Sequence, residues 1–245
     1  MSFDQKILII RFSSIGDIVL TTSPLKTIRN RFPNAQISYV TLEEFAPLLE
    51  FHPNIDRLIP LSKNMTGTNL WEFSDYIRKQ NYSTIFDLHN SLRSNIITFR
   101  TTRPVLQLKK PRWNRFMLFQ FHQNIFADDF STRKMYHEHL GKIWQEGDEI
   151  PNTSLQVTNH EKNEALSFVG EDSYITLIPG AAWGQKQWSS DKYIELIQDI
   201  NMSVVLLGEK KDKICFQITN KVPSVINLAG KTSLRQALAI LSNST

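Results

Sequence analysis

The segment ILIIRFSSIGD, residues 7–17, decides the fold. Its first four residues form an apolar run that is typical of a parallel strand covered on both faces. A polar loop containing Gly16 follows, and residues 18–32 then place apolar side chains at helical spacing until Pro33. Pro24 lies inside that stretch, so we expect the helix to begin or bend there. This strand–loop–helix unit predicts an α/β protein.

The same alternation continues along the chain in two series. Short apolar runs predict strands at 37–41, 56–61, 84–88, 174–178, 204–207 and 225–228, separated by helices at 43–49, 71–79, 161–168, 189–200 and after Ser233. This rhythm predicts doubly wound parallel sheets. Between 101 and 150 the only clear element is a helix over 134–144. We therefore predict one domain at 1–155 and a second at 156–245, in which about three strands are fewer than such a sheet usually has.

The composition is that of a globular protein of a reducing compartment. Apolar residues make up 41% of the 245 residues and charged residues 21%. The single cysteine excludes an internal disulfide framework and a structural zinc site. No signal peptide and no apolar stretch of roughly 20 residues is found. We expect a cytoplasmic monomer without a metal.

Positive charge is concentrated in one region of the chain. Between Asp87 and Asp128 there is no acidic residue, although seven basic residues and several aromatic ones lie there. Such a segment attracts phosphate groups, nucleic acid or an acidic membrane surface. A solvated basic face with a few core aromatic residues explains the composition equally well.

The loop after the first strand carries the first candidate for chemistry. It lies where α/β proteins bind ligands, at the carboxyl end of a strand, but it lacks a dinucleotide fingerprint because Gly16 is its only glycine. Asp17 is either a helix N-cap or a carboxylate within reach of a substrate hydroxyl proton. A helix N-terminus would lower the pKa of Asp17 and keep it ionised.

The second candidate site is the loop PGAAWGQKQW, residues 179–188. Small residues after a strand let an anion approach the backbone, Lys186 adds a charge, and the following helix adds its partial positive charge. The alternative is an ordinary exposed lysine in a turn. A Walker A loop at Gly230-Lys231-Thr232 is excluded because its first glycine would fall on Val225.

With both loops in view, the sequence resembles the family 9 glycosyltransferases, the lipopolysaccharide heptosyltransferases. The matching stretches are ILIIRFSSIGDIVLTTSPLKTIRNRFPNAQISYVT, FDLHNSLRS, LIPGAAWGQKQWSSDKYIELI, VVLLGEKKD and INLAGKTSLRQALAIL. The resemblance implies a GT-B fold of two Rossmann-like domains, the second incomplete here. The first domain would bind the lipopolysaccharide acceptor and the second the donor, ADP-heptose, in an inverting reaction without a metal.

The resemblance also implies roles for single residues. Asp17 matches the proposed general base, and Lys186 matches a lysine that contacts the donor phosphates. The remaining implied donor residues are Gly180, Ala181, Ala182 and Asp212, and the implied acceptor residues are Ser14, Gly16 and Arg93.

The sequence departs from the family pattern in two places. Hydroxyl residues are usual near Ala181 and Ala182, so fewer side chains are available to bond phosphate. The segment D-[ST]-G-x-x-H, expected beyond Thr245, is absent. We therefore expect a truncated form with weakened donor binding.

Two other functions fit parts of the sequence. A non-catalytic remnant of the fold would retain only anion or glycolipid binding through residues 93–115. Nucleic-acid binding rests only on basic and aromatic residues. We expect a nucleotide-sugar donor, an anionic glycolipid acceptor and peripheral contact with the inner membrane, and no nucleic acid.

Overall fold

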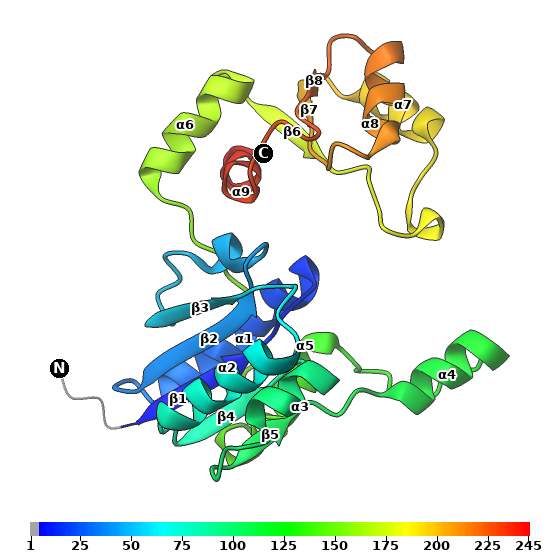
Figure 1. Cartoon of the computed structure of the whole chain (residues 1–245). Helices are drawn as coiled ribbons and strands as arrows, with labels where there is room; N and C mark the ends of the chain where they lie inside the picture. The colour runs from blue at the N-terminus through cyan, green and yellow to red at the C-terminus, as the bar shows by residue number, and fades with distance from the viewer. Residues whose placement is uncertain (1–4) are drawn as a thin grey trace. The chain divides into compact units, whose positions relative to one another are not determined.

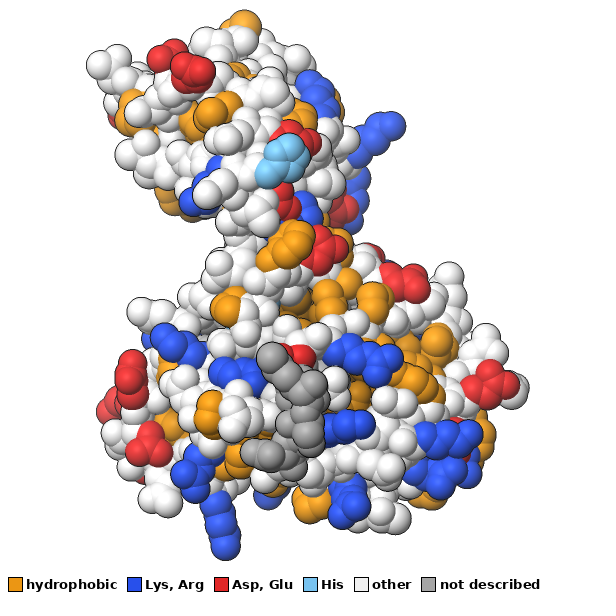
Figure 2. Space-filling model, turned by 90° about the vertical axis from the view of Figure 1, so that its left-hand side faces the viewer, with side chains coloured by type: hydrophobic (Ala, Val, Ile, Leu, Met, Phe, Trp, Pro, Cys, Tyr) orange, Lys and Arg blue, Asp and Glu red, His pale blue; other side chains and the backbone are white. Residues whose placement is uncertain are grey.

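The computed structural model describes residues 5–245, which fold into two compact units, the first ending at Gln156 and the second running from Val157 to Thr245. Both have the predicted α/β architecture with parallel sheets (Figure 1). Charged and apolar side chains are mixed over the face of the molecule shown in Figure 2. The boundary lies one residue from the predicted one, while the binding role of each domain stays a prediction.

The first unit contains a parallel sheet in the order β3-β2-β1-β4-β5. The strands are β1 (Lys6–Ile10), β2 (Gln36–Leu42), β3 (Arg57–Leu61), β4 (Thr84–Asp87) and β5 (Val105–Gln107). In the central strand, Ile9 pairs with Tyr39 on one side and Phe86 on the other. Residues 7–10 are fully buried, because helices cover both faces of the sheet.

Helices α1 (Ile15–Arg31) and α5 (Thr132–Glu138) pack together, as do α2 (Gly67–Lys79) and α3 (Leu92–Thr98). The α2–α3 face is filled by a cluster that includes Leu8, Leu70 and Ile97. A short 3-10 helix, η1 (Ala46–Leu49), replaces the helix predicted over 43–49. Pro24 neither begins nor interrupts α1, which starts at Ile15.

The region 101–150 contains more structure than the sequence predicted. Strand β5 and helix α4 (Arg112–Phe121) both lie there. The helix predicted over 134–144 was wrong at its carboxyl end. It ends at Glu138, with His139 as the C-cap, and Gly141, which has a positive φ of 66°, begins a short 3-10 helix, η2 (Gly141–Ile143).

The second unit contains the three predicted strands, in the order β6-β7-β8. These are β6 (Tyr174–Leu177), β7 (Ser203–Leu206) and β8 (Ile226–Asn227), and the helices are α6 (Asn159–Val169), α7 (Ser190–Asp199), α8 (Lys213–Lys221) and α9 (Leu234–Asn243). A 3-10 helix, η3 (Gly184–Lys186), lies in the loop before α7. Ser233 caps α9 as predicted, since its Oγ accepts a hydrogen bond from the Gln236 N–H at 3.2 Å. One apolar cluster packs α6 and α9 on one face of the sheet, and a second packs α7 and α8 on the other.

Candidate functional site

The carboxyl edge of the first sheet holds the predicted Asp17 loop. Strand β1 lies between β2 and β4, so the chain leaves β1 to one side through α1 and returns on the other side at β4. At such a reversal of strand order the adjacent loops diverge and leave space for a ligand. Side chains that follow β1, β4 and β5 meet at this edge.

Asp17 is the third residue of α1, and Ser14 is the N-cap. The N-cap role weighed for Asp17 is therefore wrong. Asp17 instead completes a capping box, in which Asp17 Oδ2 lies 3.5 Å from Ser14 N and 3.2 Å from Ser14 Oγ. This fixes the carboxylate beside the first turn of the helix.

Arg11 holds Asp17 from the buried side. Its Nη2 forms an ion pair with Asp17 Oδ2 at 2.6 Å, where the Arg11 side chain is 7% exposed and that of Asp17 35%. Arg11 also donates to the carbonyls of Ser13 and Leu88, both at 2.7 Å. One guanidinium thus ties the loop after β1 to the end of β4.

Tyr136, on α5, donates its hydroxyl to Asp17 Oδ1 at 3.1 Å. Burial by itself raises the pKa of Asp17, but the charge of Arg11 and the hydrogen bonds from Tyr136 and Ser14 outweigh it and lower that pKa below 3.8. Asp17 is therefore ionised at neutral pH. Burial raises the pKa of Tyr136, so its hydroxyl stays protonated and keeps donating.

The loop after β4 brings a second set of polar groups to the same edge. Asp87 is fully buried and accepts hydrogen bonds from the N–H groups of His89 and Asn90. Burial, together with the charges of Arg11, Lys110 and Arg93, lowers the pKa of His89 to about 4, so its ring is neutral at pH 7. Its Nδ1 is buried without a hydrogen-bond partner among residues 5–245.

Lys110 follows β5 and donates to the Asn90 carbonyl at 3.2 Å. Burial and the nearby charges of Arg11 and Arg112 lower the pKa of this lysine. With Arg11 and Arg93, it makes this edge of the sheet electropositive, which favours an anionic ligand.

The predicted acceptor residues lie at this edge as well. Ser14 and Gly16 are exposed, and a Cβ added to Gly16 would meet nothing within 4 Å, so the first turn of α1 borders open space. Arg93 is in the first turn of α3, where its guanidinium donates to the Lys63 carbonyl at 2.8 Å.

In the second unit, a cavity of about 640 Å³ lies at the amino-terminal ends of α7 and α8. Its lining includes Ala181, Trp188, Ser189, Ser190, Asp212 and Gln217. Helix amino-termini present free N–H groups and a partial positive charge, which suit a phosphate. The cavity therefore unites two of the predicted donor residues, Ala181 and Asp212.

Asp212 is also a packing residue. Its Oδ2 accepts a hydrogen bond from the Glu209 N–H at 2.7 Å. A Cβ on Gly180 or Gly208 would overlap this carboxylate, so both glycines are needed for its close approach. Ala182 and Lys186 are exposed on the same loop, outside the lining of the cavity.

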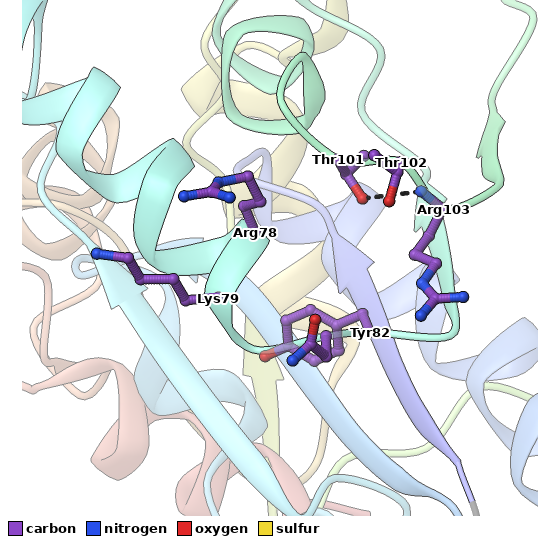
Figure 3. A pocket seen from close by; sticks show the side chains of 7 residues that line it. Arg78, Lys79, Tyr82, Thr101, Thr102 and Arg103 are labelled. Carbon is purple, nitrogen blue, oxygen red and sulfur yellow. Dashed lines mark hydrogen bonds between the residues drawn. The ribbon is translucent and has the colours of Figure 1, made fainter.

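A further cavity, of about 360 Å³, lies elsewhere in the first unit (Figure 3). Arg78 and Lys79 come from the end of α2, whereas Thr101, Thr102 and Arg103 precede β5. The cavity is thus at the amino ends of β4 and β5, opposite the edge that carries Asp17. We do not assign it to the candidate site.

Within residues 5–245, no group of three or more His, Cys, Asp or Glu side chains is placed to hold a metal ion. His137 and His139 each face the carbonyl four residues earlier in the chain, those of Arg133 and Met135. Metal independence stays a prediction. Over the same residues, no helix is long and apolar enough to cross a membrane.

Sequence reasoning missed several residues of this site. Arg11 could have been found from the sequence, because a charged residue directly after a fully apolar strand must find a partner when it is buried. Tyr136 could not, since it is 119 positions from Asp17 and its neighbours are unremarkable. His89 and Lys110 were not singled out, although Lys110 is one of the seven basic residues between Asp87 and Asp128.

Comparison with known proteins supports the likeness seen in the sequence. Residues 70–245 match the family model for glycosyltransferase family 9 (heptosyltransferase). Lipopolysaccharide heptosyltransferase 2 of Escherichia coli K12 is 25% identical over 267 residues, which cover 97% of this chain and 75% of that protein.

Two solved structures share the fold. The family 9 glycosyl transferase of Veillonella parvula has a TM-score of 0.80 at 20% identity, covering all of this chain and 75% of that one. An E. coli heptosyltransferase with ADP has a TM-score of 0.69 at 19% identity, covering 98% and 79%. These likenesses confirm the predicted GT-B type of α/β fold. The chain belongs to glycosyltransferase family 9, the heptosyltransferase family, and is a glycosyltransferase.

Proposed function

We propose that this glycosyltransferase transfers a heptose from ADP-heptose to the inner core of lipopolysaccharide, with inversion at the anomeric carbon and without a metal. The observation that carries the proposal is the Asp17 carboxylate, which is ionised and part-exposed at the reversal of strand order in the first sheet. The curated relative in E. coli is a lipopolysaccharide heptosyltransferase, and one structure of similar fold contains ADP.

Asp17 is suited to act as a general base. Oδ2 is occupied by Arg11 and Ser14, whereas Oδ1 accepts a hydrogen bond only from Tyr136 among residues 5–245. A carboxylate oxygen has two lone pairs, so Oδ1 can accept a second hydrogen bond from the acceptor hydroxyl. As the acceptor oxygen bonds to the anomeric carbon, Asp17 takes the proton and the bond to the diphosphate breaks. A single displacement of this kind inverts the configuration.

The donor would be held by the second unit. The cavity at the starts of α7 and α8 is suited to a nucleoside diphosphate, and we assign its lining residues Ala181 and Asp212, with Gly180 and Ala182 of the adjoining loop, to donor binding. Lys186 would approach the leaving diphosphate, whose negative charge grows as the bond breaks. Ser14, Gly16 and Arg93 would contact the anionic acceptor, and we place the reaction at the cytoplasmic face of the inner membrane.

The decisive experiment measures ADP release with ADP-heptose and a heptose-deficient lipopolysaccharide acceptor. In Asp17→Asn, we expect turnover to fall by about 10²- to 10⁴-fold, while the dissociation constant for ADP in calorimetry stays unchanged. Asp75→Asn is the matched control, because Asp75, on α2, is another ion-paired carboxylate, bound to Arg78, Lys79 and Arg100.

Full turnover in Asp17→Asn would refute the assignment of the base. A product that retains the donor's anomeric configuration, seen by NMR, would refute the single displacement. If the chain binds glycolipid but neither ADP nor ADP-heptose, the non-catalytic binding protein becomes the better description.

A further inference from the structure

Helix α4 (Arg112–Phe121) is the least embedded helix of the first unit. None of its residues is buried, and Figure 1 shows it extending away from the sheet. It begins just after Lys110, whose ammonium group reaches the Asn90 carbonyl at the edge that carries Asp17. A helix without a buried residue gains little from the core of its own unit, so its apolar residues require another explanation.

The exposed residues of α4 include a cluster of aromatic rings. Trp113 stacks on Phe116 with ring centroids 5.5 Å apart, and Phe116 meets the edge of Phe121 at 5.8 Å. Trp113 is 65% exposed and Phe116 47%. With Met117, these residues are spaced three and four apart, so they share one side of the helix. A contiguous exposed apolar patch of this kind marks an interaction surface.

Positive charge borders this aromatic side. Arg112 and Arg115 are exposed and form no ion pair within residues 5–245, and Lys109 and Lys110 precede the helix. No acidic residue occurs from 88 to 127, so α4 itself carries no negative charge. Phe119, which is 80% exposed, lies on the same side of the helix as the two arginines. Exposed aromatic rings with arginines among them are the composition of a helix that lies in a membrane interface.

We propose that α4 docks the first unit on an anionic phospholipid bilayer. Trp113, Phe116 and Phe121 enter the boundary between headgroups and acyl chains, while Arg112 and Arg115 contact lipid phosphates. Charge complementarity selects this occupant over a second copy of the chain, because two copies of α4 would bring their arginines together. Given the proposed function, the docked helix would hold the Asp17 edge near a lipid-linked acceptor.

The test is flotation of the full chain with vesicles that contain neither lipopolysaccharide nor donor. We expect binding to vesicles of phosphatidylcholine mixed with phosphatidylglycerol, weak binding to phosphatidylcholine alone, and weaker binding as salt rises. Arg112→Gln/Arg115→Gln should lower the partition coefficient by about tenfold or more. Trp113→Ser/Phe116→Ser should lower it on both kinds of vesicle.

Two matched controls distinguish binding through α4 from non-specific binding of the chain to vesicles. Phe216→Ser removes an aromatic ring from α8 that is 45% exposed, close to the 47% of Phe116, and Lys142→Gln/Lys221→Gln removes two exposed charges elsewhere. Neither should change vesicle binding. Because α4 has no buried residue, the α4 variants should unfold at the same urea concentration as the parent chain.

Equal vesicle binding by the α4 variants and the parent chain would overturn the proposal. Binding that requires lipopolysaccharide in the vesicle would overturn it in favour of direct acceptor recognition. Dimerisation in light scattering that the Trp113→Ser/Phe116→Ser change abolishes, without vesicle binding, would overturn it in favour of self-association. The vesicles contain no donor or acceptor, so a lack of vesicle binding would not contradict the proposed transfer reaction. A lack of transfer activity would likewise not contradict membrane docking by α4.

Discussion

The loops that carry the proposed chemistry, residues 11–17 in the first unit and 179–188 in the second, are held in opposite ways. Asp17 is bound by Arg11, Ser14 and Tyr136, which come from the loop after β1 and from α5. Lys186 is exposed, and its N–H bonds to the Trp183 carbonyl within its own loop. The geometry of Asp17 is thus part of the fold, whereas the position of Lys186 depends on what it binds. Substitutions around Asp17 should therefore change the free energy of unfolding, whereas substitution of Lys186 should change ligand binding.

The largest effect is expected from Arg11→Met. This change leaves the buried carbonyls of Ser13 and Leu88 without their donor and Asp17 without its cation. The free energy of unfolding should fall by about 2–4 kcal/mol, measured by urea denaturation. Arg31→Met is the control, because Arg31 is an exposed arginine at the end of α1. A loss as small as that of the control would mean that the Asp17 loop is not held by the fold.

Gly180→Ala should test a tightly packed position in the second loop. The new Cβ would displace the Asp212 carboxylate from the Glu209 N–H, at a cost of about 1–2 kcal/mol in the free energy of unfolding. Gly184→Ala is the matched control, because a Cβ there meets nothing within 4 Å. Adding Asp212→Ala to Gly180→Ala should recover part of the loss, since the overlap is then relieved. Simple additivity of the two changes would contradict this packing.

Lys186→Met should affect ligand binding alone. We expect the dissociation constant for ADP, measured by calorimetry, to rise about tenfold as one charge-assisted contact is lost. The free energy of unfolding should change by less than about 0.5 kcal/mol, because the side chain is exposed. Lys221→Met should change neither quantity. A marked loss of stability in Lys186→Met would break the contrast between the loops.

Tyr136→Phe should give the smallest effect, and one that depends on pH. The lost hydrogen bond to a part-exposed, solvent-screened carboxylate should cost about 1 kcal/mol at pH 7. The folded-state pKa of Asp17 lies below 3.8, so the stability that comes from its carboxylate is complete above 3.8 and is lost as the pH falls through the folded pKa. The difference between the two proteins in urea denaturation should therefore shrink at pH values below 3.8. As a control, the free energy of unfolding of Tyr193→Phe should differ from that of the parent chain by the same amount at pH 7 and below pH 3.8. If the Tyr136→Phe difference were also independent of pH, that would contradict the link to Asp17.

Most strands and helices could be predicted, because each is encoded by the pattern of apolar and polar residues within its own segment. Residues 7–10 read as a strand covered on both faces, and they are fully buried. Two elements of the segment 101–150 could not be predicted, since β5 is three residues long and α4 lacks the buried stripe that makes helical periodicity visible. Asp17 was found as a candidate, but its place as the third residue of α1 depended on where the helix starts.

The sequence by itself determined the alternation of strands and helices, the two loops at strand ends and the family to which they point, because these are encoded by residues close together in the chain. Only the tertiary structure decided what surrounds Asp17. Arg11 reaches the end of β4, 77 positions away, and Tyr136 approaches from α5, 119 positions away. Of the groups that lower the pKa of Asp17, Arg11 and Ser14 lie within six positions of it, whereas Tyr136 is brought to it only by the fold, and no local pattern records that hydrogen bond.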